Sequence, residues 1–252
     1  MFGVLLDEAK KIARNPRRLR EAFRLRRWRQ FFGILRFNSR TGNRWKPAEG
    51  ASGLKQREYP SYEEYVRHQQ SKFGHLDLTE YDRAYRVLLR ERLRTSALLK
   101  PGASVLCLGA RQGTEVKAFH DLGCFAVGID LNPGKENKFV LPGDFHDVQF
   151  PDRSVDVVFT NSFDHTLDPE KLLQQITRLL KPGGMLVIEA IQGEAEHSAP
   201  DYYASFWWEK IDDLLALIGR HGFKVARRTP FNEPWPGEQI FFSRVGSGSA
   251  NG

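Results

Sequence analysis

The sequence predicts an α/β protein with a seven-stranded, mostly parallel sheet, an antiparallel last strand and N-terminal helices ahead of the sheet. Two observations support this prediction. Apolar runs of four to six residues alternate with helical patterns between about residues 100 and 244, as expected for parallel strands covered by helices on both faces. The last two runs are joined by residues 229–238, which are too few for a helical crossover, so these strands are expected to pair antiparallel.

The main α/β domain is expected over residues 96–245. Its strands are expected at residues 104–108, 125–129, 138–141, 155–160, 185–189, 224–228 and 239–244, and its helices at 114–122, 169–180 and 208–221. Only 13 residues separate Asp130 from Asp144. A loop around residues 133–135 is therefore expected where a helix would otherwise join the second and third strands.

Shorter segments flank this domain. Residues 1–58 are expected to form a basic helical arm followed by a polar, Gly-punctuated linker at 38–58, and residues 59–95 a helical lid or cap. In the cap, Ser61 is the expected N-cap of the first helix and Glu64 holds the capping-box position. Residues 246–252 form a Gly/Ser/Asn tail that is expected to be disordered. The helices expected ahead of the main domain span residues 2–13, 17–37, 62–73 and 79–99.

The net positive charge of the chain comes from its N-terminal segment. Residues 1–60 contain 16 Lys and Arg against 5 Asp and Glu, although the whole chain carries only +7. The rest of the chain is mildly acidic and is a poor candidate for holding nucleic acid by itself. Within the arm, residues 17–37 combine many Arg side chains with a stripe of Trp, Phe and Leu. This pattern fits an anionic membrane surface, RNA phosphates, or docking on an acidic protein surface. The size of the aromatic stripe favours the membrane surface or a protein partner.

The composition also bears on the compartment. No apolar run approaches the ~20 residues of a membrane span, and early charged residues such as Asp7 and Glu8 argue against a secretory signal. Cys107 and Cys124 are the two cysteines; both lie in apolar contexts, and they are too few for a zinc site. We therefore expect a cytoplasmic protein, with association to a membrane as the open addition.

A glycine-bearing turn follows the first strand of the main domain. Gly109 and Gly113 stand between that strand and the next helix, where a glycine turn lets the backbone approach a ligand and the helix start offers unpaired N–H groups. Asp130 follows at the tip of the second strand, where an acid would hold the hydroxyl pair of a ribose. The ordered pair of signals predicts a nucleoside-containing ligand.

Three further segments complete a known pattern. They are Gly143-Asp144-Phe145, the stretch from Phe150-Pro151-Asp152 to Asp164-His165, and Leu180-Lys181-Pro182-Gly183-Gly184. With them, residues 100–245 resemble the class I S-adenosylmethionine (SAM)-dependent methyltransferases, in particular the methyltransferase type 11 group. The resemblance implies a Rossmann-like fold, SAM as cofactor and transfer of its methyl group.

The resemblance also implies a role for each matching residue. Gly109 and Gly113 would line the methionine and ribose end of SAM, and Asp130 would hold the ribose hydroxyls. Asp144 would bind the adenine amino group, and Phe145 would lie beside the adenine. In addition, Asn161 would face the sulfonium and the acceptor.

The expected catalytic residues are His165 and Asp164. If the acceptor is a hydroxyl, either side chain could remove its proton. The alternative for His165 is an orienting residue that hydrogen-bonds Asp164. The family usually has an acidic residue where Cys107 stands, and a middle glycine where Arg111 stands. Two compensations stay open, namely that Glu115 takes over for the missing acid or that Arg111 binds the SAM carboxylate.

Aromatic side chains crowd both flanks of the expected site. The tyrosines of residues 59–85 either form a lid over the acceptor or simply cover the sheet. Trp207 and Trp208 either line a substrate pocket or pack an insertion.

Because Asn161 is followed by Ser-Phe-Asp, methylation of a nucleobase amino group is disfavoured. We expect methyl transfer to a hydroxyl of a small-molecule or glycan acceptor. The alternatives are a regulatory protein that binds SAM or S-adenosylhomocysteine without turnover and, less favoured because a third turn glycine is missing, an NAD-type oxidoreductase.

Overall fold

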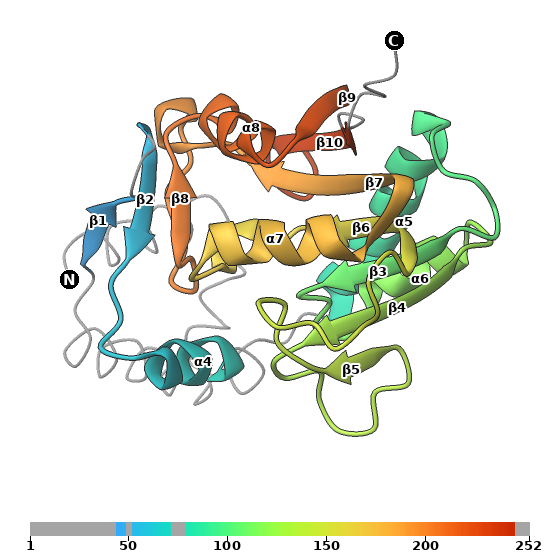
Figure 1. Ribbon diagram of the computed structural model, residues 1–252, viewed down its shortest axis with the longest axis horizontal. Coiled ribbons are helices and arrows are strands. Elements are labelled where there is room, and N and C mark those ends of the chain that lie inside the picture. The colour runs from blue at the N-terminus through green and yellow to red at the C-terminus, as the bar shows by residue number, and fades with distance from the viewer. Residues whose placement is uncertain (1–43, 49–51, 72–78, 245–252) are drawn as a thin grey trace, which may run out of the picture.

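A computed structural model of the protein describes residues 44–48, 52–71 and 79–244 (Figure 1). The helices expected at 2–13 and 17–37 and the tail at 246–252 lie outside the described residues. Within these ranges, no helix has both the length and the apolar character needed to cross a membrane.

The centre of the molecule is a seven-stranded sheet (Figure 1). Its strands, in spatial order, are β5 (Val140–Pro142), β4 (Phe125–Asp130), β3 (Ser104–Leu108), β6 (Val155–Thr160), β7 (Leu180–Ile191), β10 (Gly237–Arg244) and β9 (Phe223–Phe231). The strands from β5 to β7 are parallel, and β10 lies antiparallel between β7 and β9. The predicted fold class, including the antiparallel last strand, is confirmed.

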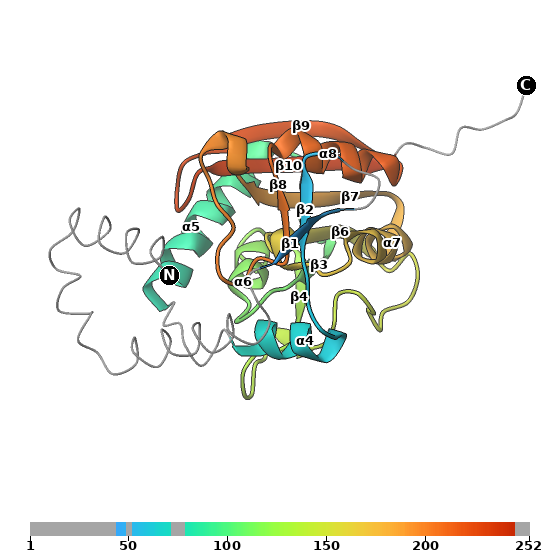
Figure 2. The same cartoon turned by 90° about the vertical axis from the view of Figure 1, so that its left-hand side faces the viewer.

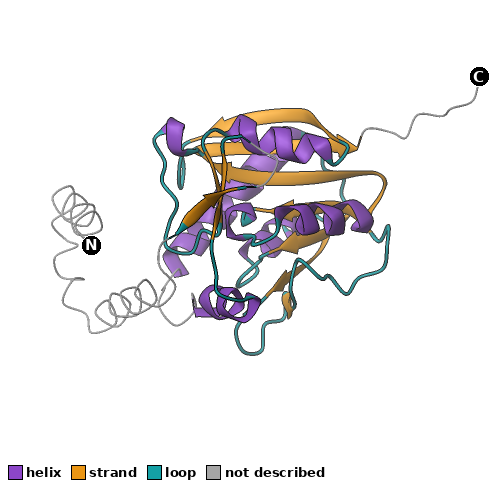
Figure 3. Ribbon diagram, turned by 60° about the vertical axis from the view of Figure 1, so that its left-hand side comes forward, coloured by secondary structure: helices purple, strands orange, loops and turns teal. Residues whose placement is uncertain are grey.

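Helices cover both faces of this sheet (Figure 3). On one face, α5 (Thr79–Ser96) and α6 (Thr114–His120) share a buried cluster with β3 and β6. On the other face, α7 (Pro169–Leu179) and α8 (Ile211–Arg220) do the same. Each helix therefore turns an apolar stripe to the sheet, as its periodic sequence predicted. In α7, for example, Leu172, Ile176 and Leu179 are fully buried, and Asp168 caps its start by accepting a hydrogen bond from the Lys171 N–H at 2.9 Å.

The expected connection between β4 and β5 is also confirmed, because residues 131–139 contain no helix. The helix boundaries differ from the predictions by a few residues, as fraying ends do. A larger difference concerns β7, which begins at Leu180 rather than Met185. Residues up to Gly184 join the strand through a register shift between Val155 and Val157 of β6.

Ahead of the sheet, α4 (Tyr62–Gln70) starts at the predicted N-cap, where the Ser61 hydroxyl accepts a hydrogen bond from the Glu64 N–H at 3.3 Å. A second, three-stranded sheet consists of β1 (Trp45–Pro47), β2 (Leu54–Arg57) and β8 (Phe206–Trp208). Figure 2 shows α4 and this small sheet on the same side of the molecule.

The small sheet corrects two expectations. The described part of residues 38–58 is not a linker, because it forms β1 and β2. The helix expected at 208–221 begins only at Ile211, because Trp208 belongs to β8 and pairs with Leu54. A strand that finds its partner about 150 residues away leaves no local periodic signal in either segment. The short 3₁₀ helices η2 (Phe163–His165) and η3 (Glu194–Glu196) complete the described elements.

Candidate functional site

A cavity of about 270 Å³ lies at the carboxyl ends of the parallel strands, next to α4 and β8. Its volume is close to the ~300 Å³ lower end for small-molecule sites, and ligands of open α/β sheets bind at this edge. Seven of the nine predicted site residues line it, and Gly113 and Asp144 do not. The seven are Gly109, Arg111, Asp130, Phe145, Asn161, Asp164 and His165.

The glycine turn between β3 and α6 requires its glycines. Gly109 has a φ of +70°, and a Cβ atom there would lie 2.7 Å from Cβ of Ser162. Gly113 has a φ of +82°, and a Cβ atom would lie 2.8 Å from Cβ of Phe139. The backbone of Arg111 is also in the left-handed region, with a φ of +46°. Glycine adopts this conformation without strain, whereas Arg111 adopts it with a side chain. The turn thus brings bare backbone to the cavity wall.

Asp130 closes the other side of this turn. Its Oδ2 accepts a hydrogen bond from the Arg111 N–H at 2.9 Å, and its Oδ1 accepts one from the Asn132 N–H at 2.8 Å. A carboxylate offers about four acceptor positions, so each oxygen can still accept a ligand hydroxyl. The arrangement suits the vicinal hydroxyls of a ribose.

Asp144 is held by other protein groups instead. Its Oδ1 accepts hydrogen bonds from the His146 N–H at 2.8 Å and from the His146 ring at 2.9 Å, and its Oδ2 accepts one from the Tyr62 hydroxyl. Burial would raise the pKa of this carboxyl, but the contacts with His146 outweigh burial and lower it. Asp144 thereby ties α4 to the main domain. Its expected contact with adenine stays a prediction, whereas the neighbouring Phe145 does line the cavity.

A chain of hydrogen bonds connects Glu115, Asn161 and Glu189, which all line the cavity. The Asn161 amide donates to Oε1 of Glu115 at 3.0 Å and to the Tyr85 hydroxyl at 2.8 Å. Tyr85 in turn donates to Oε2 of Glu189 at 2.8 Å. Burial raises the pKa of Glu115 to about 7, with the charge of Arg111 partly offsetting this effect. The second oxygen of that carboxyl, Oε2, has no hydrogen-bond partner among the described residues.

Glu189 anchors this network and was missed in the sequence. Arg92 binds it with two hydrogen bonds, from Nε at 2.7 Å and from Nη2 at 2.9 Å, and the Gln239 amide adds a third at 2.8 Å. Its side chain is completely buried. The available signal was an acidic residue at the end of an otherwise apolar strand, a pattern that burial tolerates only with partners.

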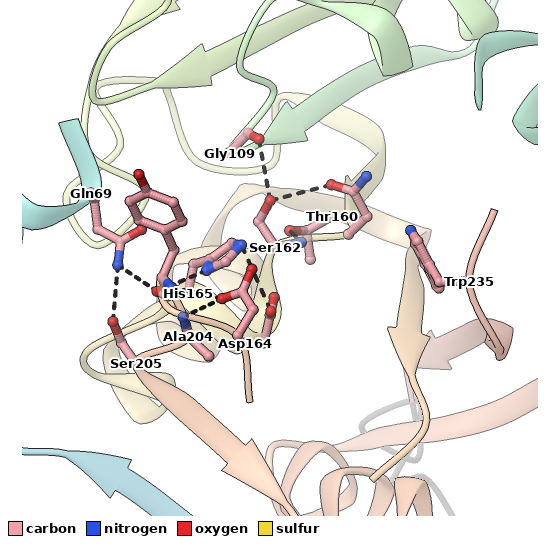
Figure 4. A network of polar contacts seen from close by, with 12 residues as sticks. Gln69, Gly109, Thr160, Ser162, Asp164, His165, Ala204, Ser205 and Trp235 are labelled. Carbon is pink, nitrogen blue, oxygen red and sulfur yellow. Dashed lines mark hydrogen bonds and ion pairs between the residues drawn. The ribbon is translucent and has the colours of Figure 1, made fainter. Parts of the chain in front are cut away.

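His165 lines the cavity from η2, and Figure 4 shows it beside Asp164. Its Nδ1 lies 3.0 Å from the carbonyl oxygen of Tyr203. A carbonyl only accepts, so Nδ1 carries the proton and Nε2 of the neutral ring keeps its lone pair. Nε2 lies 3.7 Å from Oδ2 of Asp164. Asp201 adds a carboxylate, and the three residues place one possible metal-ligand atom each within 4.8 Å of the others.

Residues of the cap, 59–95, also contact His165 or line the cavity. The Tyr65 hydroxyl donates to the His165 carbonyl oxygen at 3.0 Å, and the Gln69 amide donates to the Tyr203 carbonyl oxygen at 2.8 Å. Tyr81 lines the cavity and accepts a hydrogen bond from the Trp235 indole at 2.9 Å. Tyr85, by contrast, is fully buried against the sheet. Tyr85 thus covers the sheet, whereas a lid role for the cavity-lining Tyr65 and Tyr81 stays a prediction.

Arg111 is paired within the protein. Its Nη2 donates to Oδ1 of Asp82 at 3.0 Å, and its guanidinium lies 5.8 Å from the centre of the Tyr81 ring. Asp82 and Tyr81 belong to α5, so this side chain links the glycine turn to the cap. The remaining guanidinium donors stay available to a ligand in the cavity.

Comparison with known proteins finds similar methyltransferases. Residues 106–188 match the family model described as "Methyltransferase domain". An uncharacterized methyltransferase of Geobacillus thermodenitrificans is 25% identical over 175 residues, which are 58% of this chain and 81% of that protein. A demethylmenaquinone methyltransferase of Paenarthrobacter aurescens is 35% identical over 130 residues, 48% of this chain, and this match spans only 49% of that protein.

A solved structure shows the same fold. It is the 1,6-didemethyltoxoflavin-N1-methyltransferase of Burkholderia thailandensis, with bound 1,6-didemethyltoxoflavin and S-adenosylhomocysteine. It superposes with a TM-score of 0.56 at 15% identity and covers 79% of this chain and 99% of that chain.

Proposed function

This chain carries a class I SAM-dependent methyltransferase domain, and we propose from this premise that it methylates a hydroxyl group of a small-molecule or glycan acceptor. The observation that carries the proposal is the fixed orientation of His165 in the cavity wall. Because Nδ1 donates to the Tyr203 carbonyl, Nε2 of the neutral ring would provide a base in the cavity.

The residues of the cavity fit SAM. Gly109 offers backbone without a side chain, Asp130 offers acceptors for the ribose hydroxyls, and Phe145 offers an apolar contact for adenine. Asn161, at the end of β6, adds a polar group between the cofactor side and the acceptor side. When bound there, SAM would supply an activated methyl group on its sulfonium.

His165 and Asp164 would divide the proton chemistry. Nε2 of His165 takes the proton of the acceptor hydroxyl as the oxygen attacks, and the Tyr203 carbonyl holds Nδ1–H in place. The charge that develops on the ring is stabilised by the Asp164 carboxylate, whose Oδ2 lies 3.7 Å from Nε2. Aromatic residues such as Tyr65 and Trp208 exclude water from the acceptor.

Calorimetric titration with SAM, S-adenosylhomocysteine and NAD tests the cofactor assignment. We expect the first two ligands to bind and NAD not to bind. Asp130→Ala should weaken SAM binding at least ~10-fold, since two charge-assisted hydrogen bonds are lost. Asp212→Ala is the matched control, because the Asp212 side chain is 70% exposed and does not line the cavity. Equal affinities of both variants would refute the role of Asp130.

An acceptor screen with labelled SAM then tests the hydroxyl assignment. Once an acceptor is found, His165→Gln should lower kcat with little change in KM. A variant with unchanged kcat would show that His165 only orients its neighbours.

A second candidate is a regulatory protein that binds SAM or S-adenosylhomocysteine without turnover. It is favoured by the two departures in the cofactor turn, Cys107 and Arg111. Micromolar binding together with no methyl transfer to any member of an acceptor library would support it.

We also propose that residues 17–37 attach the protein to an anionic membrane surface from the cytoplasmic side. This segment lies outside the described residues, and its Arg content and aromatic stripe support the proposal. Flotation with vesicles containing anionic lipid tests it, using the full chain and a variant lacking residues 1–43. Equal flotation of both would leave docking on a protein partner as the role of the arm.

A further inference from the structure

Glu115 is a buried acid whose environment does not satisfy it. It stands in the first turn of α6 with only 2% of its surface exposed, and it lines the cavity. Asn161 donates to Oε1, while Oε2 has no hydrogen-bond partner in the described part of the chain. A buried carboxylate with one unpaired oxygen destabilises the fold in its ionised form. Such a group is expected where a ligand completes its environment.

The groups around Glu115 provide no hydrogen bond to its Oε2 among the described residues. Arg111 supplies the nearest positive charge, but its Nη2 is bound to Asp82. The Tyr85 hydroxyl donates to Glu189, which carries a second buried negative charge. From β3, Cys107 packs in the buried cluster shared with α5 and α6, and burial, with a smaller effect of the charge of Glu115, raises the pKa of its thiol. The carboxylate therefore extends from α6 into the neighbourhood where the strand itself has Cys107 in place of an acid.

We propose that Oε2 of Glu115 accepts a hydrogen bond from the α-ammonium group of SAM. The inference rests on the proposed function and deepens it by assigning the amino-acid end of the cofactor. An ammonium group combines a positive charge with three donors, so it neutralises the buried carboxylate and fills its empty acceptor position. Charge-assisted hydrogen bonds of this kind are the strong ones in a buried site.

A ligand comparison isolates this contact. 5′-Methylthioadenosine has the adenosine and thioether parts of S-adenosylhomocysteine but no amino-acid end. Glu115→Gln should weaken S-adenosylhomocysteine binding ~10-fold or more and change 5′-methylthioadenosine binding less than twofold. Glu80→Gln, which removes an exposed carboxylate at the start of α5, should change neither affinity.

The wild-type protein provides a second test that needs no variant. Below about pH 7, Glu115 is protonated in the free protein and must lose its proton on binding, so affinity for S-adenosylhomocysteine should rise up to tenfold per pH unit. At more alkaline pH, the α-ammonium group of the ligand loses its own proton and affinity should fall. Because 5′-methylthioadenosine has no α-amino group, its affinity should not show this optimum. Arg111, Asp82, Tyr81, Tyr85 and Cys107 interact electrostatically with Glu115, and the same comparison subtracts their titration.

The outcomes separate the inference from the proposed function. If the wild-type protein binds neither SAM nor S-adenosylhomocysteine, the proposed function fails. If it binds them and Glu115→Gln leaves their affinity unchanged, or weakens 5′-methylthioadenosine equally, the inference fails and the function stands. A selective loss in the variant, or an affinity optimum seen only with the amino-acid ligand, supports the inference.

Discussion

Glu189 is the residue through which the hydrogen-bond network in the cavity wall can be tested as a stabilising unit. Its carboxylate accepts four hydrogen bonds, two from Arg92 and one each from Tyr85 and Gln239. Its side chain is completely buried, and that of Arg92 is 12% exposed. Glu189→Gln removes the negative charge and places an NH₂ group among four donors, so the guanidinium keeps a buried charge without compensation.

Breaking one partner of a buried ion pair costs about 3–5 kcal/mol. For a protein of this size, each kcal/mol shifts Tm by about 2–4 °C, so Glu189→Gln should lower Tm by about 6–20 °C. The surface pair of Asp212 and Arg228 gives the control, because the Asp212 side chain is 70% exposed. Asp212→Asn should cost less than about 1 kcal/mol.

Urea denaturation followed by tryptophan fluorescence, together with thermal melts, measures both variants. In addition, Arg92→Met should cost less in the Glu189→Gln background than in the wild type, with a coupling energy of about 0.5–3 kcal/mol. Losses below 1 kcal/mol in both single variants, or strict additivity with Arg92→Met, would refute the idea that this pair stabilises the fold as a unit.

Three further predictions address other parts of the structure. Gly128→Ala places a Cβ atom 2.5 Å from Cβ of Ala110 and should cost about 1–3 kcal/mol in urea unfolding; Gly219→Ala, with open space in α8, should instead stabilise by about 0.5–1 kcal/mol. Removing the N-cap of α7 with Asp168→Ala should cost about 1 kcal/mol, and an unchanged midpoint would contradict the role of this cap. Because the pKa of Glu115 is about 7 in the folded protein and ~4.3 in the unfolded chain, the folded form holds a proton that the unfolded form loses in this window. Wild-type stability should therefore fall relative to Glu115→Gln by about 3–4 kcal/mol in total as pH rises from about 4 to 7, and parallel stability–pH curves would contradict the raised pKa.

The main sheet was predictable because its signals are local. The segments that form β3 and β6 are short apolar runs between glycines, prolines or polar residues, and their bounds match the structure. Parallel strands bring their carboxyl ends to one edge. Residues far apart in sequence, such as Gly109 and His165, could therefore be expected in one cavity.

The parts that could not be predicted depend on distant contacts. The Tyr62 hydroxyl donates a hydrogen bond to Asp144, which lies 82 residues away in the sequence. The sequence around neither residue contains a pattern that predicts this contact. Likewise, the sequence predicts that Trp208 begins an amphipathic helix. In the structure it is the last residue of β8, because it pairs with Leu54. The sequence could not predict that one carboxylate oxygen of Glu115 lacks a hydrogen-bond partner, because this depends on which side chains surround it in the fold.

The pairing of β2 with β8 also has a consequence for the order in which the protein folds. The part of the cavity wall that contains Gly109, Asp130 and Asn161 comes from one continuous stretch of the chain, whereas the small sheet joins Leu54 to Trp208 across about 150 residues. Closing so long a loop is slow and becomes favourable only on a surface that already exists. During synthesis, β2 must therefore wait until β8 has left the ribosome before the two strands can pair. Pulse-labelled hydrogen exchange during refolding should show amides of β2 protected after those of β3, and simultaneous protection would contradict this order.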